Sequence, residues 1–229
     1  MAVQDATTGP GAAAGAAQRD WAQIIRTRLA GSTPRHDVSQ WLVPGMFEPI
    51  SASQRRRLPQ DPVPAAVLIP LIERPGLTVL FTQRATQLRN HAGQISFPGG
   101  RIESADGSPS AAALREAREE IGLAERFVSV IGYLPDHVVI SGFRITPVVA
   151  LVQPGFELLL DSQEVQDTFE VPLDYLFDPV NHHRHRRRSA ITGEELEFCE
   201  IPFGDRNIWG ATAGMLLTLY RVCVGPADE

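Results

Sequence analysis

Residues 97–123 read FPGGRIESADGSPSAAALREAREEIGL, and this stretch decides the fold. Ser108 and Pro109 predict the start of a helix, because serine caps helix N-termini and proline suits the first helical position. Gly122 predicts its end, where a left-handed residue is common. The apolar positions on one side of this helix, which we expect to pack against a sheet, are Ala113, Ala117 and Ile121.

The other side of the predicted helix is acidic. Glu116, Glu119 and Glu120 are spaced i, i+3 and i+4, so their carboxylates share one face. Like charges at this spacing cost about 0.2–0.5 kcal/mol per pair, which Arg115 and Arg118 partly offset, so a solvated face is the simpler interpretation. The upstream glycine pair favours a metal site instead, since it lets backbone carbonyls approach a ligand. Mg²⁺ prefers such carboxylate and carbonyl oxygens.

The stretch resembles the Nudix box, G-x5-E-x7-R-E-U-x-E-E-x-G-U, in which U is aliphatic. Gly100 supplies the first glycine, and residues 115–123 supply the second half without a gap. Two departures occur: Asp106 stands in place of the first glutamate, and eight residues rather than seven separate it from Arg115. The extra residue lies in the loop, so the helix register is kept and only the role of Asp106 is open.

A second resemblance narrows the subfamily. Residues 80–100, LFTQRATQLRNHAGQISFPGG, are similar to the signature of Nudix enzymes acting on coenzyme A, roughly L-L-T-x-R-S-x-x-L-R-x-H-x-G-x-x-x-F-P-G-G. That subfamily also commonly carries the longer box loop with an aspartate. With residues 141–152 and 208–216, the resemblance covers roughly residues 62–222. The matching positions are Thr82, Arg84, Leu88, Arg89, His91, Gly93 and residues 97–100.

The resemblance implies a Nudix fold, an α/β/α sandwich around a mixed sheet. The order of expected strands and helices independently predicts a mixed sheet covered on both faces. The Nudix resemblance also implies bound Mg²⁺ or Mn²⁺, with Arg115 orienting a glutamate through charge-assisted hydrogen bonds. The implied metal ligands are Glu116, Glu119, Glu120 and the carbonyl of Gly100, with Gly99 as its alternative.

The general base in Nudix enzymes is a box glutamate or an acidic residue of a later loop. The box candidates for catalysis are Arg115, Glu116 and Glu119. Glu164 is the loop candidate for the base, with Glu170 as second choice, and the simpler interpretation of either is an ordinary loop carboxylate.

Three signature residues are candidates for substrate binding. Arg84 and Arg89 suit contacts to a diphosphate, or else hold the sheet edge as structural charges. His91 contacts the substrate or, alternatively, the loop backbone.

The implied reaction is hydrolysis of coenzyme A to 3′,5′-ADP and 4′-phosphopantetheine. Rival substrates are ADP-ribose, dinucleotides such as NADH, and oxidised or acylated coenzyme A. A Nudix-fold module that senses a nucleotide without cleaving it is the alternative from another class. A sensor, however, has no need of three mutually repelling carboxylates.

Composition sets limits on these interpretations. The 229 residues suit one domain with some extra sequence, and the net charge of −6 argues against nucleic acid as a partner. Cys199 and Cys223 form neither a metal spacing nor a disulfide framework. Because neither a membrane-length apolar run nor a secretory signal is evident, we expect a cytoplasmic protein without membrane contact. The sequence leaves a homodimer open.

Three segments are expected along the chain: a disordered tail over 1–19, an N-terminal helix and linker over 20–61, and a Nudix hydrolase domain over 62–222. The first helix has apolar residues at helical spacing from Trp21 to Leu29, with Asp20 as its cap. A short helical turn is expected over 172–177 and a closing helix from Trp209 to Cys223. Expected strands cover residues 65–72, 77–82, 94–97, 127–134, 144–152, 156–160 and 196–201.

Two basic runs stand out. Residues 182–188, HHRHRRR, are either a solvated loop or a contact to the 3′-phosphate of a nucleotide. The three arginines at 55–57 are interpreted as solvated surface.

Overall fold

The computed structural model describes residues 19–36, 42, 59–88, 91–139, 141–188 and 195–225. An eight-stranded mixed sheet forms its centre, with the path β3-β2-β1-β7-β5; β4 pairs with β1, β6 with β7 and β8 with β2. β1 and β7 are parallel, whereas the other pairs are antiparallel. The strands are β1 (Val63–Glu73), β2 (Leu77–Arg84), β3 (Ile95–Ser96), β4 (Gly99–Arg101), β5 (Val128–Tyr133), β6 (His137–Val138), β7 (Phe143–Val152) and β8 (Val165–Pro172).

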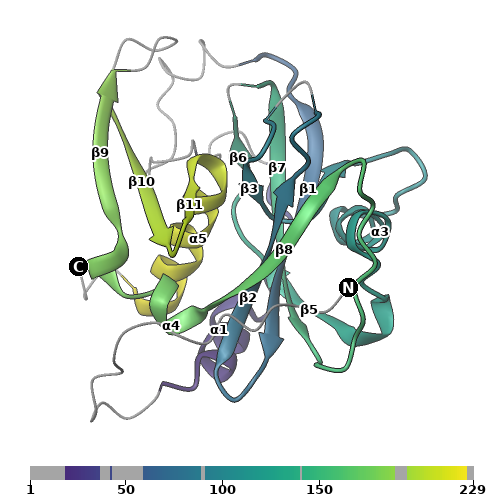
Figure 1. Cartoon of the computed structure of the whole chain (residues 1–229), viewed down its shortest axis with the longest axis horizontal. Helices are drawn as coiled ribbons and strands as arrows, with labels where there is room; N and C mark the ends of the chain where they lie inside the picture. The colour runs from purple at the N-terminus through teal and green to yellow at the C-terminus, as the bar shows by residue number, and fades with distance from the viewer. Residues whose placement is uncertain are drawn as a thin grey trace.

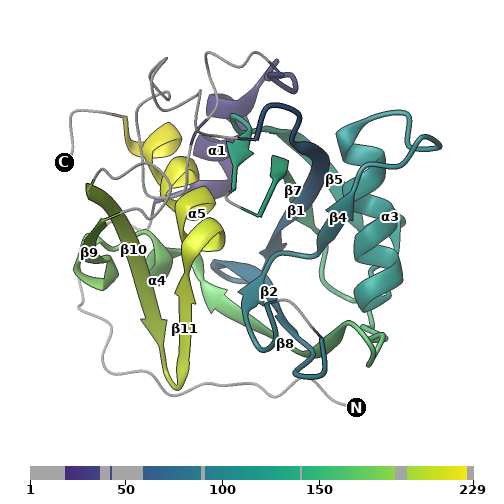
Figure 2. The ribbon, with the colours of Figure 1, turned by 90° about the horizontal axis from the view of Figure 1, so that it is seen from above.

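Helices cover both faces of this sheet (Figures 1 and 2). On one face α3 (Pro109–Ile121) packs its buried Ala113 and Ala117 against alternate residues of β1 and β7. Small residues let the helix lie close to the sheet. On the other face lie α1 (Trp21–Leu29) and α5 (Gly210–Val224). The predicted α/β/α sandwich with a mixed sheet is confirmed.

The helix α1 is capped and buried as its sequence pattern predicts. The side chain of Asp20 accepts a hydrogen bond from the backbone N–H of Gln23 at 3.0 Å. Trp21, Ile25 and Leu29 are buried against the α5 side of the core. The predicted short helical turn is likewise present as α4 (Leu173–Leu176). Two 3₁₀ helices also occur: η2 (Glu125–Phe127) precedes β5, and η3 (Pro179–Asn181) precedes β9.

A second sheet of three strands lies beside α5, in the order β11-β10-β9. Its strands are β9 (His183–Arg188), β10 (Glu195–Phe203) and β11 (Arg206–Trp209). Residues 183–188 of the basic run are therefore a strand, so the solvated loop, one of the two interpretations of this run, is wrong. The run pairs antiparallel with β10, and in the backbone register Arg188 stands opposite Glu195 and Arg186 opposite Glu197. Figures 1 and 2 place β9 and α3 on opposite sides of the molecule, which disfavours a contact from this run to a ligand on α3.

Two further strand predictions need correction. Residues 156–160 form no strand. The backbone N–H groups of Leu159 and Asp161 instead donate hydrogen bonds to the last carbonyls of α3. Conversely, β8 was not predicted, although it pairs with β2 along most of its length. The arginines at 55–57 lie outside the described residues.

Candidate active site

The local sequence fixes the register of the acidic helix. Ser108 Oγ accepts a hydrogen bond from the backbone N–H of Ala111 at 3.1 Å, and Pro109 occupies the first turn. Gly122 ends the helix in the left-handed conformation, at φ 69°. Both predicted ends of α3 are confirmed. The predicted division into an acidic and an apolar side is wrong for Glu120, which is buried like the core alanines, whereas Glu116 is half-buried and Glu119 exposed.

Arg115 is the centre of a hydrogen-bond network. Its Nε and Nη2 bind the two carboxylate oxygens of Asp106 at 3.1 and 3.0 Å. Its Nη1 donates to Glu116 Oε1 and Glu119 Oε2, both at 2.9 Å, while Nη2 also reaches the carbonyl of Arg101 at 3.0 Å. These acceptors, above all Asp106, raise the pKa of Arg115. The guanidinium thus ties the box loop to two of the helix carboxylates.

The geometry assigns a role to Asp106, the residue that departs from the box pattern. Besides its two-pronged pairing with Arg115, it accepts a hydrogen bond from the backbone N–H of Glu103 at 2.8 Å. The hydrogen bonds from Arg115 hold the pKa of Asp106 below its ordinary value. An aspartate in the longer loop therefore reaches the arginine and anchors it as an ionised partner.

Glu120 is the buried member of the acidic face, with 5% of the residue exposed. Its Oε2 accepts a hydrogen bond from the backbone N–H of Gly99 at 3.1 Å. Its pKa is raised to about 8, chiefly by burial and also by the charges of Glu116 and Glu164, against the opposing hydrogen bond from Gly99. A carboxylate so placed favours a cation beside it.

The glycine pair brings backbone up to these carboxylates. A Cβ at Gly99, whose φ is 154°, would lie 2.4 Å from the carbonyl oxygen of Ala66. A Cβ at Gly100 would lie 2.6 Å from the carboxylate carbon of Glu116. At Gly99 the backbone of β1 leaves no room for a side chain, whereas at Gly100 a Cβ would displace the carboxylate of Glu116.

Glu164 joins the acidic face from another part of the chain. It lies in an exposed turn before β8, and its charge raises the pKa of Glu116, on which burial has the largest effect. The second candidate, Glu170, is separated from this group. Its carboxylate pairs with Arg74 at 2.7 Å and also accepts a hydrogen bond from Thr78, next to the β1–β2 turn.

The signature residues are placed unequally. Arg84 ends β2, and its charge lowers the pKa of Glu120, so it lies beside the acidic face. Its Nε is buried and has no hydrogen-bond partner among the residues that the structure describes. His91 has a positive φ of 57°, and its Nδ1 lies 2.9 Å from Oε1 of Gln94 within the same loop. Arg89 lies outside the described residues.

The donor set fits a hard divalent cation in its chemistry. Carboxylates gather from α3 and from the turn at Glu164. Burial first, and the neighbouring carboxylates second, raise the pKa of Glu116 and of Glu120. Within the described ranges, however, no three His, Cys, Asp or Glu side chains form a ready-made metal cage. Arg115 and Gly99 each bind only one oxygen of a given glutamate, so a second oxygen of each remains for another ligand.

The NUDIX domain model matches residues 62–191, which contain this acidic helix, the glycine pair and Glu164. The chain belongs to the Nudix family. An uncharacterized Nudix hydrolase, NudL, of Salmonella paratyphi B is 41% identical over 160 residues, covering 68% of this chain and 80% of that protein. The Salmonella newport NudL shows the same values. The chain is a Nudix pyrophosphohydrolase of a nucleotide derivative, and Nudix hydrolases generally use divalent metals.

Solved Nudix structures are more distant. A MutT/nudix family protein of Enterococcus faecalis is 15% identical with a TM-score of 0.45, covering 70% of this chain and 61% of that chain. A C. elegans Ap4A hydrolase binary complex is 18% identical with a TM-score of 0.41, covering 48% and 80%. At these values neither adds to the family assignment. Separately, none of the helices in the described ranges is both long and apolar enough to cross a membrane.

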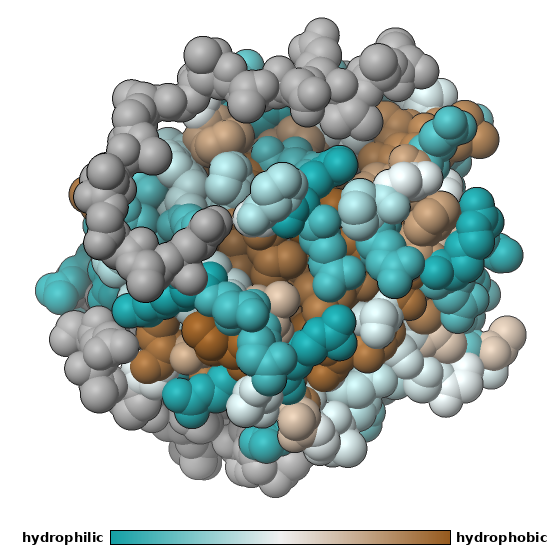
Figure 3. All heavy atoms as spheres, turned by 90° about the horizontal axis from the view of Figure 1, so that it is seen from below, coloured by the Kyte–Doolittle hydropathy of each residue, from teal (hydrophilic) through white to brown (hydrophobic). Residues whose placement is uncertain are grey.

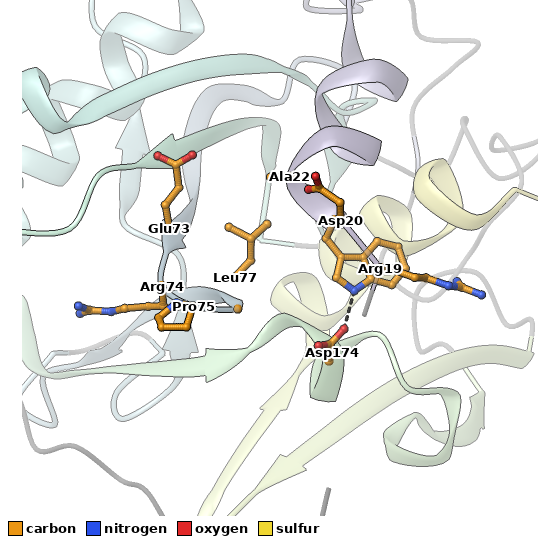
Figure 4. Close-up of a pocket in the computed structure, with 10 residues that line it drawn as sticks. Arg19, Asp20, Ala22, Glu73, Arg74, Pro75, Leu77 and Asp174 are labelled. Carbon is orange, nitrogen blue, oxygen red and sulfur yellow. Dashed lines mark hydrogen bonds between the residues drawn. The ribbon is translucent and has the colours of Figure 1, made fainter. Parts of the chain in front are cut away.

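A surface pocket of about 360 Å³ lies elsewhere, between the start of α1, the β1–β2 turn and α4 (Figure 4). Figure 3 shows the molecule from below Figure 1, with apolar residues in the middle and hydrophilic ones around them. Charged groups of the pocket already pair within the protein: Asp174 accepts from Trp21 Nε1 at 2.6 Å, and Arg74 pairs with Glu170. The residues that line this pocket include none from α3.

Proposed function

We propose that this Nudix hydrolase cleaves the diphosphate of coenzyme A, or of a derivative, giving 3′,5′-ADP and 4′-phosphopantetheine. The observation that carries the proposal is the position of Arg84. This residue of the coenzyme A-type signature lies beside Glu120 of the box, with a buried Nε that lacks a partner among the described residues. A guanidinium at such a place suits a phosphate oxygen.

Glu116, Glu119 and Glu120, with the carbonyl of Gly100, are the proposed ligands of Mg²⁺ or Mn²⁺. When bound, such cations neutralise charge on the diphosphate oxygens and lower the pKa of water. Arg115 holds one oxygen of Glu116 and one of Glu119, which limits the orientations of both side chains. Its own anchor on Asp106 keeps the guanidinium fixed during this task.

Glu164 is the proposed general base. It is exposed to solvent and close enough to Glu116 and Glu120 to raise the pKa of both. A carboxylate there orients an attacking water and accepts its proton at a carboxylate oxygen. Arg84 and Arg89 are the proposed contacts of the anionic phosphates, and His91 is proposed to bind substrate while its Gln94 contact holds the loop.

The test is a panel of diphosphates: coenzyme A, its acylated and oxidised forms, ADP-ribose and NADH, each with Mg²⁺ or Mn²⁺. We expect coenzyme A or a derivative to give the highest kcat/KM, with 3′,5′-ADP among the products. Glu119→Gln and Glu120→Gln should abolish this turnover. Faster cleavage of ADP-ribose or NADH would reject the substrate assignment, and binding without turnover by the unmutated protein would favour a sensor.

The role of Glu164 has its own test. Glu164→Gln should lower kcat by a factor of about 10²–10⁴, the usual contribution of a general base, without changing the affinity for Mn²⁺. Glu157→Gln is the matched control, since Glu157 is an exposed acid in the same segment. A near-normal kcat for Glu164→Gln would remove that residue from the mechanism.

A further inference from the structure

The segment that leads to Glu164 is fastened to the end of the acidic helix. The backbone N–H of Leu159 donates to the carbonyl of Ile121 at 3.0 Å, and that of Asp161 donates to the carbonyl of Glu120 at 2.9 Å. The last carbonyls of a helix lack partners within the helix, so these two bonds satisfy them. These bonds fix the backbone of Asp161 relative to that of Glu120, the buried acid of the box.

From Asp161 the chain makes one tight turn to Glu164. The carbonyl of Asp161 accepts hydrogen bonds from the N–H of Glu164 at 3.0 Å and of Val165 at 2.8 Å. Its side-chain Oδ1 accepts one from the N–H of Gln163 at 2.9 Å. A short aspartate side chain that bonds the backbone two residues on stabilises this kind of turn. A single residue thus binds every residue from 163 to 165.

The far side of the turn is held by the signature loop. The N–H of Ala85 donates to the carbonyl of Glu164 at 2.9 Å, and Gln87 Nε2 donates to the carbonyl of Ser162 at 3.0 Å. The turn is consequently fixed between the acidic helix and the loop that follows Arg84. Because the side chains of residues 161–164 are exposed, hydrogen bonds rather than burial set its shape.

We propose that Asp161 is a positioning residue, which sets the carboxylate of Glu164 at a fixed place relative to Glu120. The inference rests on the proposed role of Glu164 as the base. Asp161 itself does not touch the reacting atoms in this account. It acts through the turn: without the Oδ1 bond to Gln163, the turn samples other conformations, and Glu164 spends less time where it accepts a proton.

The experiment compares Asp161→Ala with Asp161→Asn, using whichever diphosphate of the panel is turned over. Asparagine keeps Oδ1 as an acceptor for Gln163 but loses the charge, whereas alanine loses both. We expect kcat to fall about tenfold in Asp161→Ala, because displacements near 1 Å cost up to about 10²-fold, and to recover within about twofold in Asp161→Asn. The Mn²⁺ affinity should be unchanged in both. Gln163→Ala is the control, since it leaves the backbone N–H in place.

The same substitution is then made in Glu164→Gln, where Asp161→Ala should change kcat less than twofold. An equal loss in both backgrounds, or an Asp161→Asn as slow as Asp161→Ala, would overturn the positioning role. Full activity of Glu164→Gln would instead overturn the base assignment, together with what rests on it. Thermal unfolding monitors each variant, and Asp161→Ser, with a shorter acceptor and an intermediate loss expected, replaces an alanine variant that does not fold.

Discussion

Alanine substitutions at the two neighbouring glycines of β4 should have different effects, lowering mainly kcat at Gly100 and mainly stability at Gly99. At Gly100 the new Cβ would lie 2.6 Å from the carboxylate carbon of Glu116, and its nearest contacts are all on the end of that flexible side chain. At Gly99 the Cβ would meet backbone, 2.4 Å from the carbonyl oxygen of Ala66 and 2.6 Å from the Cα of Val67. A side chain can rotate away, whereas paired strands cannot.

For Gly100→Ala the magnitude follows from the distance. Ordinary contact begins near 3.4 Å, so the Glu116 carboxylate must move by about 0.8 Å, at a rotamer cost of about 0.5–1.5 kcal/mol. Displacing a metal ligand by this much should lower kcat by about 10- to 100-fold and weaken Mn²⁺ binding. The thermal midpoint should fall by only a few degrees, since about 1 kcal/mol corresponds to about 2–4 °C in a protein of this size.

For Gly99→Ala two energetic costs add together, one from the clash with β1 and one from the unfavourable φ of 154°. Overpacking costs about 1–3 kcal/mol and an unfavourable backbone conformation a further 1–3, so we expect a loss on the order of 3 kcal/mol and a midpoint about 10 °C lower. The assay measures the thermal midpoint, steady-state kcat and Mn²⁺ titration for both variants. If Gly100→Ala keeps full kcat, or if Gly99→Ala is as stable as the unmutated protein, the account of the glycine pair is wrong.

Three further predictions concern charges. Asp106→Asn should lower kcat and cost about 1.5–3 kcal/mol of stability, because the Arg115 anchor loses its ionised partner; equal kcat and midpoint would contradict this. Glu120→Gln should raise the free energy of unfolding at pH 8, with chelator present, by roughly 2–4 kcal/mol: a carboxyl whose pKa is raised to about 8 destabilises the fold as pH rises from 4.5 to 8, and glutamine abolishes that slope. Burial lowers the pKa of His137 to about 4, so the unfolded chain binds the proton more readily and stability should fall by about 3 kcal/mol from pH 6.5 to 4. Denaturant unfolding at both pH values, with His137→Gln as comparison, measures that slope.

The parts of the fold that could be predicted have local signals. The cap at Ser108, the stop at Gly122 and the cap at Asp20 each depend on one residue and its immediate neighbours, and all three are present. The closing helix was likewise recognisable from its apolar spacing, and the structure has it as α5. Local chemistry suffices where a hydrogen bond spans only a few residues.

The failures occur where partners are distant in sequence. The apolar run at 156–160 predicts a strand, but its backbone bonds go to the end of α3, which no local pattern specifies. Asp167 interrupts the alternation of apolar and polar residues along β8. Its carboxylate forms an ion pair at 2.6 Å with Arg206, which belongs to the second sheet. Residues 183–188 of the basic run form a strand because their backbone pairs with β10, which comes later in the chain. In each case the deciding partner lies outside the window that a sequence pattern covers.

The same distinction between local and distant signals applies to the residues of the candidate site. The box glutamates come from one helix, so spacing alone placed them together, while Glu164 joins them from a turn more than forty positions later in the chain. Asp106 was left without a role by its departure from the box, and only its contact with Arg115 supplies one. A sequence motif therefore specifies which acids share a face but not what holds them.

What holds the acidic face together is a balance between like charges and one guanidinium. Burial and mutual repulsion raise the pKa of Glu116 and Glu120, which on their own would favour protonation or separation of the carboxylates. Arg115 opposes this effect at Glu116, and it also donates a hydrogen bond to Glu119, whereas Glu120 accepts its hydrogen bond from the Gly99 N–H. Glu120 is therefore the carboxyl of this face whose ionisation burial disfavours most, and the charge of Arg84 partly opposes that effect. A cation bound beside Glu120 would favour the ionised form of that carboxyl, and this preference would contribute to the free energy of cation binding.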